Sequence, residues 1–123
     1  MSNDQIVSIV DDDEAVRLAT SSLVRSLGWQ ARTFASAEEF LQSGCVGKTS
    51  CLISDIMMQG MSGIDLHDRL LELGCAPPTI FMTAYSTAAL RATIEAKEVL
   101  AFLDKPIDAT AVASCLKQVL GQP

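Results

Sequence analysis

Short apolar runs alternate with longer segments of helical period along the whole chain. Five runs rich in apolar and β-branched residues are predicted to form strands, at residues 5–10, 29–34, 51–55, 79–83 and 100–103. Between and after them, apolar residues recur every three or four positions, which predicts helices at 13–28, 36–44, 62–73 and 86–96 and from about residue 108 onward. Strict alternation of strands and helices is typical of a parallel sheet with helices on both faces. The pattern therefore predicts an α/β domain built on a doubly wound, five-stranded parallel sheet.

Polar residues at the predicted helix ends support these boundaries. Ser36 and Glu39 form the pattern of a capping box at the start of the second helix. Gly28 ends the first predicted helix and Gly74 follows the third, in positions where glycine commonly ends a helix. Asp13 is the first residue of the first predicted helix and is expected to cap it, because a carboxylate there accepts hydrogen bonds from free backbone N–H groups.

The length and charge of the chain indicate how many domains it has and which partners it can bind. For 123 residues we expect one domain over residues 1–120, with 121–123 a tail or the start of a linker. The formal net charge of −6 argues against direct binding of DNA or RNA, which requires clustered lysine and arginine. A cation or a basic protein surface is the expected partner of so acidic a chain.

The cysteines and the apolar segments bear on location. The four cysteines show neither a CxxC pair nor metal-ligand spacing, and we expect free thiols. The first ten residues lack the basic segment and long apolar run of a secretory signal. No apolar run approaches the roughly 20 residues that span a bilayer. We therefore expect a cytoplasmic protein that contacts no membrane.

Polar side chains collect where the predicted strands end. Asp11 and Asp12 follow the first strand, Asp55 ends the third, Thr83 ends the fourth and Lys105 follows the fifth. In an open parallel sheet, ligands bind beyond the carboxyl ends of the strands, where the strand order reverses. If the first, third, fourth and fifth strands are neighbours, these side chains meet at one rim.

The chemistry of such a rim is that of phosphoryl transfer. Clustered carboxylates repel one another and need a counter-charge. Three carboxylates with room for water suit Mg²⁺, a hard cation that prefers oxygen ligands. Lys105 would add a positive charge and Thr83 a hydroxyl donor, and phosphoryl transfer depends chiefly on positioning and charge neutralisation. Asp55 is then the candidate nucleophile, forming an aspartyl phosphate.

Four motifs at these strand ends resemble the receiver domains of two-component response regulators. They are IVDDDEAVR at 9–17, LISDIMMQGMSG at 52–63, IFMTAYS at 80–86 and FLDKPI at 102–107. The segment SAEEFL at 36–41 is similar to that of FixJ-type regulators. The resemblance covers nearly the whole chain and implies a flavodoxin-like fold with strand order 2-1-3-4-5.

The resemblance also implies roles for single residues. Asp55 matches the phosphoacceptor, Asp12 the direct Mg²⁺ ligand and Asp11 the residue that holds the metal through water. Met57 would offer its backbone carbonyl to the metal, for which Mn²⁺ is an alternative ion. No other cofactor is implied.

A second group of residues would respond to the phosphoryl group. Thr83 matches the hydroxyl that turns toward it, and Lys105 the lysine that pairs with one of its oxygens. Phe102 lies where the family has a switch aromatic, although the sequence also allows a simple core residue there. The family's bond before Pro106 is typically cis, and we expect the same here.

Partners also follow from the resemblance. In this family a sensor histidine kinase donates the phosphoryl group. The chain is then a phosphoacceptor that assists its own phosphotransfer and slow dephosphorylation, and not an enzyme that acts on other molecules. The implied switch surface comprises the fourth helix, the fifth strand and the fifth helix, and it would control an output such as transcription. A DNA-binding output domain C-terminal to the chain and a dimer formed on phosphorylation are further implications.

Two departures from the family pattern affect these expectations. Gln59 stands where proline is usual, which restores a backbone N–H and loosens the loop after Asp55. Glu98 and Val99 replace a common Gly-Ala pair, which makes a left-handed turn before the fifth strand costly. His67 is expected at the surface of the third helix.

Three other functions are alternatives. A hydrolase with an aspartate nucleophile would need a second acid two residues after it, where the chain has Met57. A flavin-binding domain of this fold would need a Ser/Thr/Gly phosphate loop after the first strand, where the chain has three acids. A receiver-like interaction module that is never phosphorylated fits better, and it predicts weak or absent Mg²⁺ binding.

Overall fold

Five parallel strands form one sheet in the computed structural model, which describes residues 5–121. The strands are β1 (Ile6–Val10), β2 (Gln30–Phe34), β3 (Thr49–Asp55), β4 (Thr79–Thr83) and β5 (Ala101–Asp104). Their spatial order, β2-β1-β3-β4-β5, confirms the flavodoxin-like topology. The order reverses between β1 and β3, so their carboxyl ends border the crevice in which such sheets bind ligands. The expected tail at 121–123 lies, except for Gly121, outside the described residues.

Five α-helices connect and follow the strands. They are α1 (Glu14–Ser26), α2 (Ala37–Gln42), α3 (Gly63–Glu72), α4 (Ala88–Glu95) and α5 (Ala109–Leu120). Every predicted helix is present, with ends within two residues of the prediction, and a short 3₁₀ helix, η1 (Val46–Lys48), was not expected. Within residues 5–121, no helix combines the length and the apolarity needed to cross a bilayer.

β3 begins at Thr49, two residues before its predicted start. Thr49 pairs with Ile6 of β1, and its hydroxyl oxygen lies 2.7 Å from that of Ser8. The backbone N–H of Ile6 donates a hydrogen bond to the Ser50 hydroxyl at 3.3 Å. Because these side chains are polar, a search for apolar runs does not detect them, although their hydrogen bonds extend the strand.

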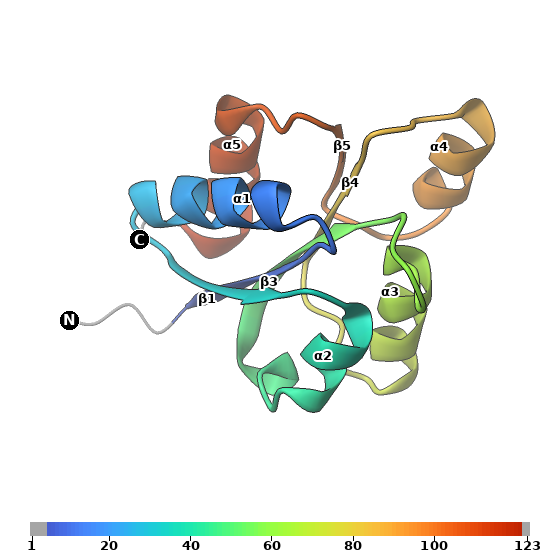
Figure 1. Cartoon of the computed structure of the whole chain (residues 1–123), viewed down its shortest axis with the longest axis horizontal. Helices are drawn as coiled ribbons and strands as arrows, with labels where there is room; N and C mark the ends of the chain where they lie inside the picture. The colour runs from blue at the N-terminus through green and yellow to red at the C-terminus, as the bar shows by residue number, and fades with distance from the viewer. Residues whose placement is uncertain (1–4, 122–123) are drawn as a thin grey trace.

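The helices cover both faces of the sheet (Figure 1). α1 and α5 pack on one face against a continuous apolar cluster, formed by Val7, Ile9, Val24, Trp29, Ala31, Cys51, Ile53, Ile80, Met82, Val112 and Leu116. α2, α3 and α4 cover the other face through two clusters that include Phe40, Leu66 and Ile94. Successive strand residues point to opposite faces, so the central strands are buried on both sides. This explains why they appear in the sequence as continuous apolar runs.

Side chains cap helices α1 and α2 as predicted. Asp13 accepts hydrogen bonds from two backbone N–H groups in the first turn of α1. The Ser36 hydroxyl accepts one from the backbone N–H of Glu39 at 3.0 Å. The return contact differs from that of a regular capping box, since Glu39 Oε2 accepts its hydrogen bond from the N–H of Ala35 and not of Ser36.

The connection between α4 and β5 contains no left-handed turn. Among the described residues, only glycines have positive φ. The Lys97 N–H donates to the carbonyl of Ile94 at 2.9 Å, and the Val99 N–H donates to the carbonyl of Lys97 at 3.1 Å. Glu98 and Val99 therefore avoid the conformation that would require glycine, and the departure from the family pattern costs no backbone strain.

His67 is buried, so the expectation of a surface residue is wrong. Its side chain is 2% exposed and packs edge-on against the Phe81 ring, with centroids 5.6 Å apart. Its Nδ1 atom has no hydrogen-bond partner among the described residues. Burial, and then the nearby charge of Lys97, lowers the pKa of His67, and the opposite influence of Asp68 is smaller. The fold therefore favours the neutral imidazole.

Acidification is expected to destabilise the protein through His67. The unfolded chain takes up a proton near the ordinary pKa of 6.5, whereas the folded state resists it. The contribution of neutral His67 to the free energy of unfolding is therefore complete above that pH and lost as the pH falls below it. Urea denaturation between about pH 7.5 and pH 5.5 measures the effect. A His67→Leu variant, which cannot titrate, should lose less stability over this range, and parallel losses would contradict the assignment.

Candidate functional site

The carboxyl ends of four neighbouring strands bring the polar residues to one rim of the sheet. Asp11 directly follows β1, Asp55 and Thr83 are the last residues of β3 and β4, and Lys105 directly follows β5. β1, β3, β4 and β5 are consecutive in the sheet, so these side chains lie at the same edge. Asp12 follows Asp11 in the turn that leads into α1.

Three carboxylates cluster at this rim. One oxygen from each of Asp11, Asp12 and Asp55 lies within 4.8 Å of the other two. Asp11 is fully buried and Asp55 is 4% exposed, whereas Asp12 is exposed to solvent. Negative charges at this separation repel one another, and burial strengthens the repulsion because it lowers the effective dielectric constant.

Lys105 supplies one positive charge to the cluster. Its Nζ atom lies 2.9 Å from Asp11 Oδ2 and 3.4 Å from Asp55 Oδ1. The lysine side chain is only 14% exposed, so both ion pairs are largely shielded from water. A single ammonium group cannot neutralise three carboxylates, and the rim keeps an excess of negative charge.

The position of Lys105 is set by its own backbone and by α1. The Lys105 N–H donates to the carbonyl of Thr83 at 2.8 Å, which ties residue 105 to β4. The Lys105–Pro106 peptide bond is cis, as expected.

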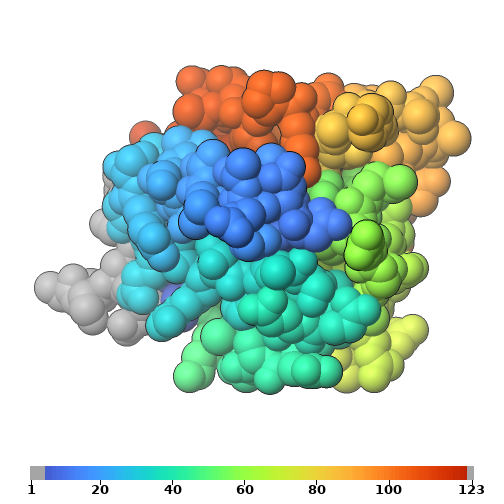
Figure 2. Space-filling model, viewed as in Figure 1, coloured from blue at the N-terminus to red at the C-terminus, as the bar shows by residue number. Residues whose placement is uncertain are grey.

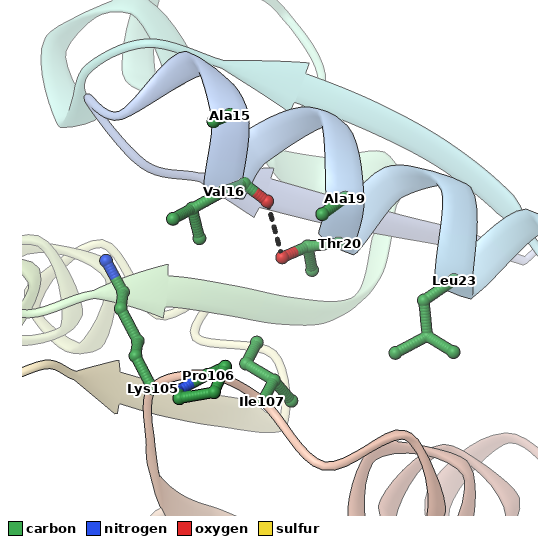
Figure 3. Close-up of a pocket in the computed structure, with 8 residues that line it drawn as sticks. All are labelled: Ala15, Val16, Ala19, Thr20, Leu23, Lys105, Pro106 and Ile107. Carbon is green, nitrogen blue, oxygen red and sulfur yellow. Dashed lines mark hydrogen bonds between the residues drawn. The ribbon is translucent and has the colours of Figure 1, made fainter.

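The lysine stem lies at one end of a groove of about 290 Å³ between α1 and residues 105–107 (Figure 3). The α1 side of the groove is formed by Ala15, Val16, Ala19, Thr20 and Leu23. In Figure 2, α1 lies at the surface between α5 and α2, so this helix is accessible along its outer side.

The crowded charges shift the pKa values of two groups. Burial, and then the negative charge of Asp11, raises the pKa of Asp55, while Lys105 and the backbone N–H of Met57 only partly offset this. Burial by itself lowers the pKa of Lys105, but its contacts with Asp11 and Asp55 outweigh burial and the net shift is upward. A second cation at the rim would reduce the repulsion and favour the ionised form of Asp55.

The loop after β3 contacts the carboxylate cluster. The backbone N–H of Gln59 donates a long hydrogen bond, 3.4 Å, to Asp12 Oδ2. Proline at this position would lack that donor, so the replacement of proline adds a contact between the loop and Asp12. Met57 reaches the cluster through its backbone, while its side chain is 64% exposed. The structure thus places Met57 at the rim without using its thioether group.

Thr83 and Phe102 lie on the same face of the sheet. β4 and β5 pair with Phe81 opposite Phe102 and Thr83 opposite Asp104, and residues two apart in a strand share a face. Thr83 is fully buried, and its hydroxyl accepts a hydrogen bond from the backbone N–H of Tyr85 at 3.1 Å. Phe102 is partly buried and packs against the cluster of Ile56, Phe81 and Ile94.

Two residues that support the rim were not identified by the sequence patterns. The N–H of Gly63 donates to the carbonyl of Ile56 at 3.0 Å, and a Cβ at Gly63 would lie 2.2 Å from the backbone oxygen of Asp55. Glu38 of α2 accepts a hydrogen bond from the backbone N–H of Met61 at 3.2 Å and so holds the loop after β3. A glycine at the first position of a helix is a weak sequence signal for close packing, and Glu38 carries no signal.

The donor set at the rim fits a hard divalent cation. All donors are oxygens, which suit Mg²⁺ better than a soft metal. Asp11 Oδ2 is buried, and its one close polar partner within residues 5–121 is the Lys105 ammonium, 2.9 Å away, so this oxygen keeps a second lone pair for another cation. His67 and the four free cysteines are not among the clustered residues. The rim therefore offers a buried oxygen with unused acceptor capacity to an incoming cation.

Comparison with known proteins gives a consistent family. The family model of the response regulator receiver domain matches residues 7–117. The response regulator protein TmoT of Ectopseudomonas mendocina is 40% identical over 106 residues, which cover 85% of this chain and 48% of TmoT. The transcriptional regulatory protein FixJ of Azorhizobium caulinodans is 33% identical over 118 residues, which cover 94% of this chain and 55% of FixJ. The chain thus spans about half the length of the curated relatives that it matches.

Two solved response regulator structures are similar to this chain in both fold and sequence. The response regulator receiver protein from Burkholderia phymatum is 36% identical, with a TM-score of 0.81 and 97% of both chains covered. The response regulator StyR is 34% identical, with a TM-score of 0.82, and the match covers 94% of this chain and 59% of StyR. With the family model matched from β1 to α5 and the acidic rim in place, the chain belongs to the receiver domains of two-component response regulators.

Proposed function

We propose that the chain is a phosphorylation-activated signalling switch, in which Asp55 accepts a phosphoryl group from a sensor histidine kinase in a Mg²⁺-dependent reaction. Receiver domains are phosphoacceptors and not enzymes with separate substrates, and they imply a cognate histidine kinase. The observation that carries the proposal is the crowding of Asp11, Asp12 and Asp55 around the single ammonium group of Lys105. This acidic triad is typical of the receiver Mg²⁺ site.

The residues at the rim would contribute to Mg²⁺ binding in different ways. Asp12 and Asp55 would ligate Mg²⁺ directly, together with the backbone carbonyl of Met57, and Asp11 would hold it through a water molecule. When bound, the ion neutralises negative charge on the transferring phosphoryl oxygens. Mn²⁺ is expected to substitute, because it shares the preference for oxygen ligands.

The chemical step is a displacement at phosphorus. One carboxylate oxygen of Asp55 forms the new bond, while the phosphorus–nitrogen bond of the phosphohistidine donor breaks and the imidazole leaves with the electron pair. Asp55 must be ionised to attack, and a cation at the rim would favour that form because it reduces the repulsion that helps to raise the pKa of Asp55. The Lys105 ammonium lies 3.4 Å from Asp55 Oδ1 and would pair with an oxygen of the transferred group.

Phosphorylation would change the contacts around Thr83 and Phe102. The modification adds about −1.5 to −2 charges and three strong acceptor oxygens beside Asp55. The Thr83 hydroxyl, which accepts from Tyr85 in this structure, would turn to donate to the phosphoryl group. Phe102 would then turn inward into the space near Thr83, and the surface of α4, β5 and α5 would change its partner. Such a change occurs only if the phosphoryl group interacts differently with the two states.

The larger protein would couple this switch to an output. We assign the receiver domain to residues 1–120 and propose that a DNA-binding output domain follows it, because the matched relatives are about twice as long and include transcriptional regulators. The acidic receiver itself would not bind nucleic acid. The protein would act in the cytoplasm and form a dimer on phosphorylation.

Treatment of the purified protein with acetyl phosphate and Mg²⁺ is expected to add the mass of one phosphoryl group. Intact-mass spectrometry measures the adduct, which should be lost when EDTA replaces Mg²⁺. An Asp55→Asn variant should gain no mass, because an amide at this position cannot form an acyl phosphate.

Two results would contradict this proposal. An unchanged mass of the wild-type protein, with bound Mg²⁺ shown by calorimetry, would favour a receiver-like interaction module that is never phosphorylated. An adduct that persists in Asp55→Asn would place the acceptor at another residue.

A further inference from the structure

Arg91 connects three parts of the proposed switch surface. Its guanidinium carbon lies 4.9 Å from the centroid of the Phe102 ring, over the face of the ring. Its Nη2 atom donates to the Ser86 hydroxyl at 3.1 Å and lies 3.9 Å from Asp104 Oδ2. Ser86 precedes α4 and Arg91 is in α4, whereas the Phe102 ring and the Asp104 carboxylate belong to β5.

The contact between Arg91 and the aromatic ring depends on the orientation of Phe102. In this structure the ring presents one face to the guanidinium group, and the Phe102 side chain also packs against the cluster of Ile56, Phe81 and Ile94. If the ring turned inward toward Thr83, Arg91 would lose the aromatic face, although Ser86 and Asp104 would still hold the guanidinium in place. The cation–π contact therefore belongs to one of the two orientations only, which is the condition for a residue to bias an equilibrium between them.

We propose that Arg91 is a positioning residue that holds Phe102 in the partly exposed orientation of this structure, here called outward, in the unphosphorylated protein and thereby opposes activation, an inference that rests on the proposed function of Asp55. Ser86 and Asp104 position the guanidinium plane over the ring. Lysine at this position would keep the charge but not the planar stacking surface, so it would hold the ring less well.

The position of the ring can be measured without any phosphoryl group. The proteins are labelled with fluorophenylalanine, and the Phe102 ¹⁹F resonance is identified by its absence in Phe102→Leu. A soluble paramagnetic agent then reports the exposure of that resonance. If Arg91 holds the ring outward, Arg91→Leu allows it to turn inward and the resonance becomes less accessible. If Arg91 does not hold the ring outward, the loss of the Arg91 side chain, which covers the ring, leaves the ring more accessible. This result would overturn the inference.

The effect on activation is measured by titration with beryllofluoride and Mg²⁺. This probe mimics a phosphoryl group on the acceptor carboxylate, so the concentration for half saturation should fall about two- to fivefold in Arg91→Leu, the factor expected from an exposed cation–π contact. Arg91→Lys should lie between Arg91→Leu and the wild type. Arg69→Leu is the matched control, because Arg69 is similarly exposed and, within residues 5–121, forms an ion pair only with Glu72 of its own helix, at 3.4 Å.

The two measurements separate this inference from the proposed function. No beryllofluoride binding by the wild-type protein would count against the phosphoacceptor role, while the ¹⁹F accessibility would still decide whether Arg91 holds the ring. Normal binding by the wild type with an unchanged half-saturation concentration in Arg91→Leu would overturn the inference about Arg91 and leave the phosphoacceptor role intact.

Discussion

Gly63→Ala is expected to destabilise the protein by about 3 kcal/mol and to weaken Mg²⁺ binding, because the structure has no room for a methyl group at this position. A Cβ at residue 63 would lie 2.2 Å from the backbone oxygen of Asp55 and 3.0 Å from the Ser54 hydroxyl. Backbone atoms cannot rotate away as a flexible side chain can. Either the start of α3 or the end of β3 must shift, and β3 carries the candidate phosphoacceptor. Urea denaturation and calorimetric Mg²⁺ titration measure the two effects.

Gly47→Ala is the matched control for this substitution. Apart from its own chain neighbours, no atom of residues 5–121 lies within 4 Å of a Cβ built at Gly47, and this glycine does not have a positive φ. Its replacement should leave stability unchanged or raise it by up to about 1 kcal/mol, since alanine restricts the unfolded chain. Equal stability of Gly63→Ala and Gly47→Ala would contradict the close packing of α3 on Asp55.

Lys105→Met is expected to lower the free energy of unfolding by about 3 kcal/mol in the absence of Mg²⁺. Methionine keeps the length of the stem in the groove beside α1, but it leaves the buried carboxylates of Asp11 and Asp55 without their cation. Added Mg²⁺ should restore part of the lost stability, because it supplies positive charge to the same oxygens. Denaturation with and without MgCl₂ measures both the loss and its recovery.

Lys97→Met provides the comparison. Lys97 pairs with Asp68, whose side chain is 49% exposed, so the remaining carboxylate stays hydrated when the lysine is lost. This variant should lose no more than about 1 kcal/mol, and its loss should not respond to Mg²⁺. Equal losses of stability in Lys105→Met and Lys97→Met, or equal responses to Mg²⁺, would contradict the crowding of negative charge at the rim.

Much of the fold could be predicted because burial on both faces leaves a strong trace in the sequence. The central strands appear as unbroken apolar runs, and the helix ends carry recognisable caps such as Asp13 and Ser36. The start of β3 was missed because Thr49 and Ser50 extend the strand through hydroxyl contacts with β1 and not through apolar packing. His67 was misplaced because a polar residue type gives no indication that the Phe81 ring covers it.

The candidate site was predictable to the extent that its residues follow the ends of strands. Asp11, Asp55, Thr83 and Lys105 each mark the carboxyl end of an apolar run, and the sheet order places those ends together. Contacts between elements distant in the sequence leave no such trace. The hydrogen bond from Met61 to Glu38 and the placement of Arg91 over Phe102 depend on three-dimensional packing, so they could be found only in the structure.

Chemical trapping of the modified residue tests the phosphoacceptor assignment most directly. Borohydride reduces an aspartyl phosphate to homoserine, which peptide mass spectrometry can locate in the sequence after treatment with acetyl phosphate and Mg²⁺. If Asp55 is the phosphoacceptor, homoserine forms at position 55 and at no other position, and none forms in the presence of EDTA. Homoserine at a different aspartate, or its formation at residue 55 without a divalent ion, would contradict the role assigned to this carboxylate cluster.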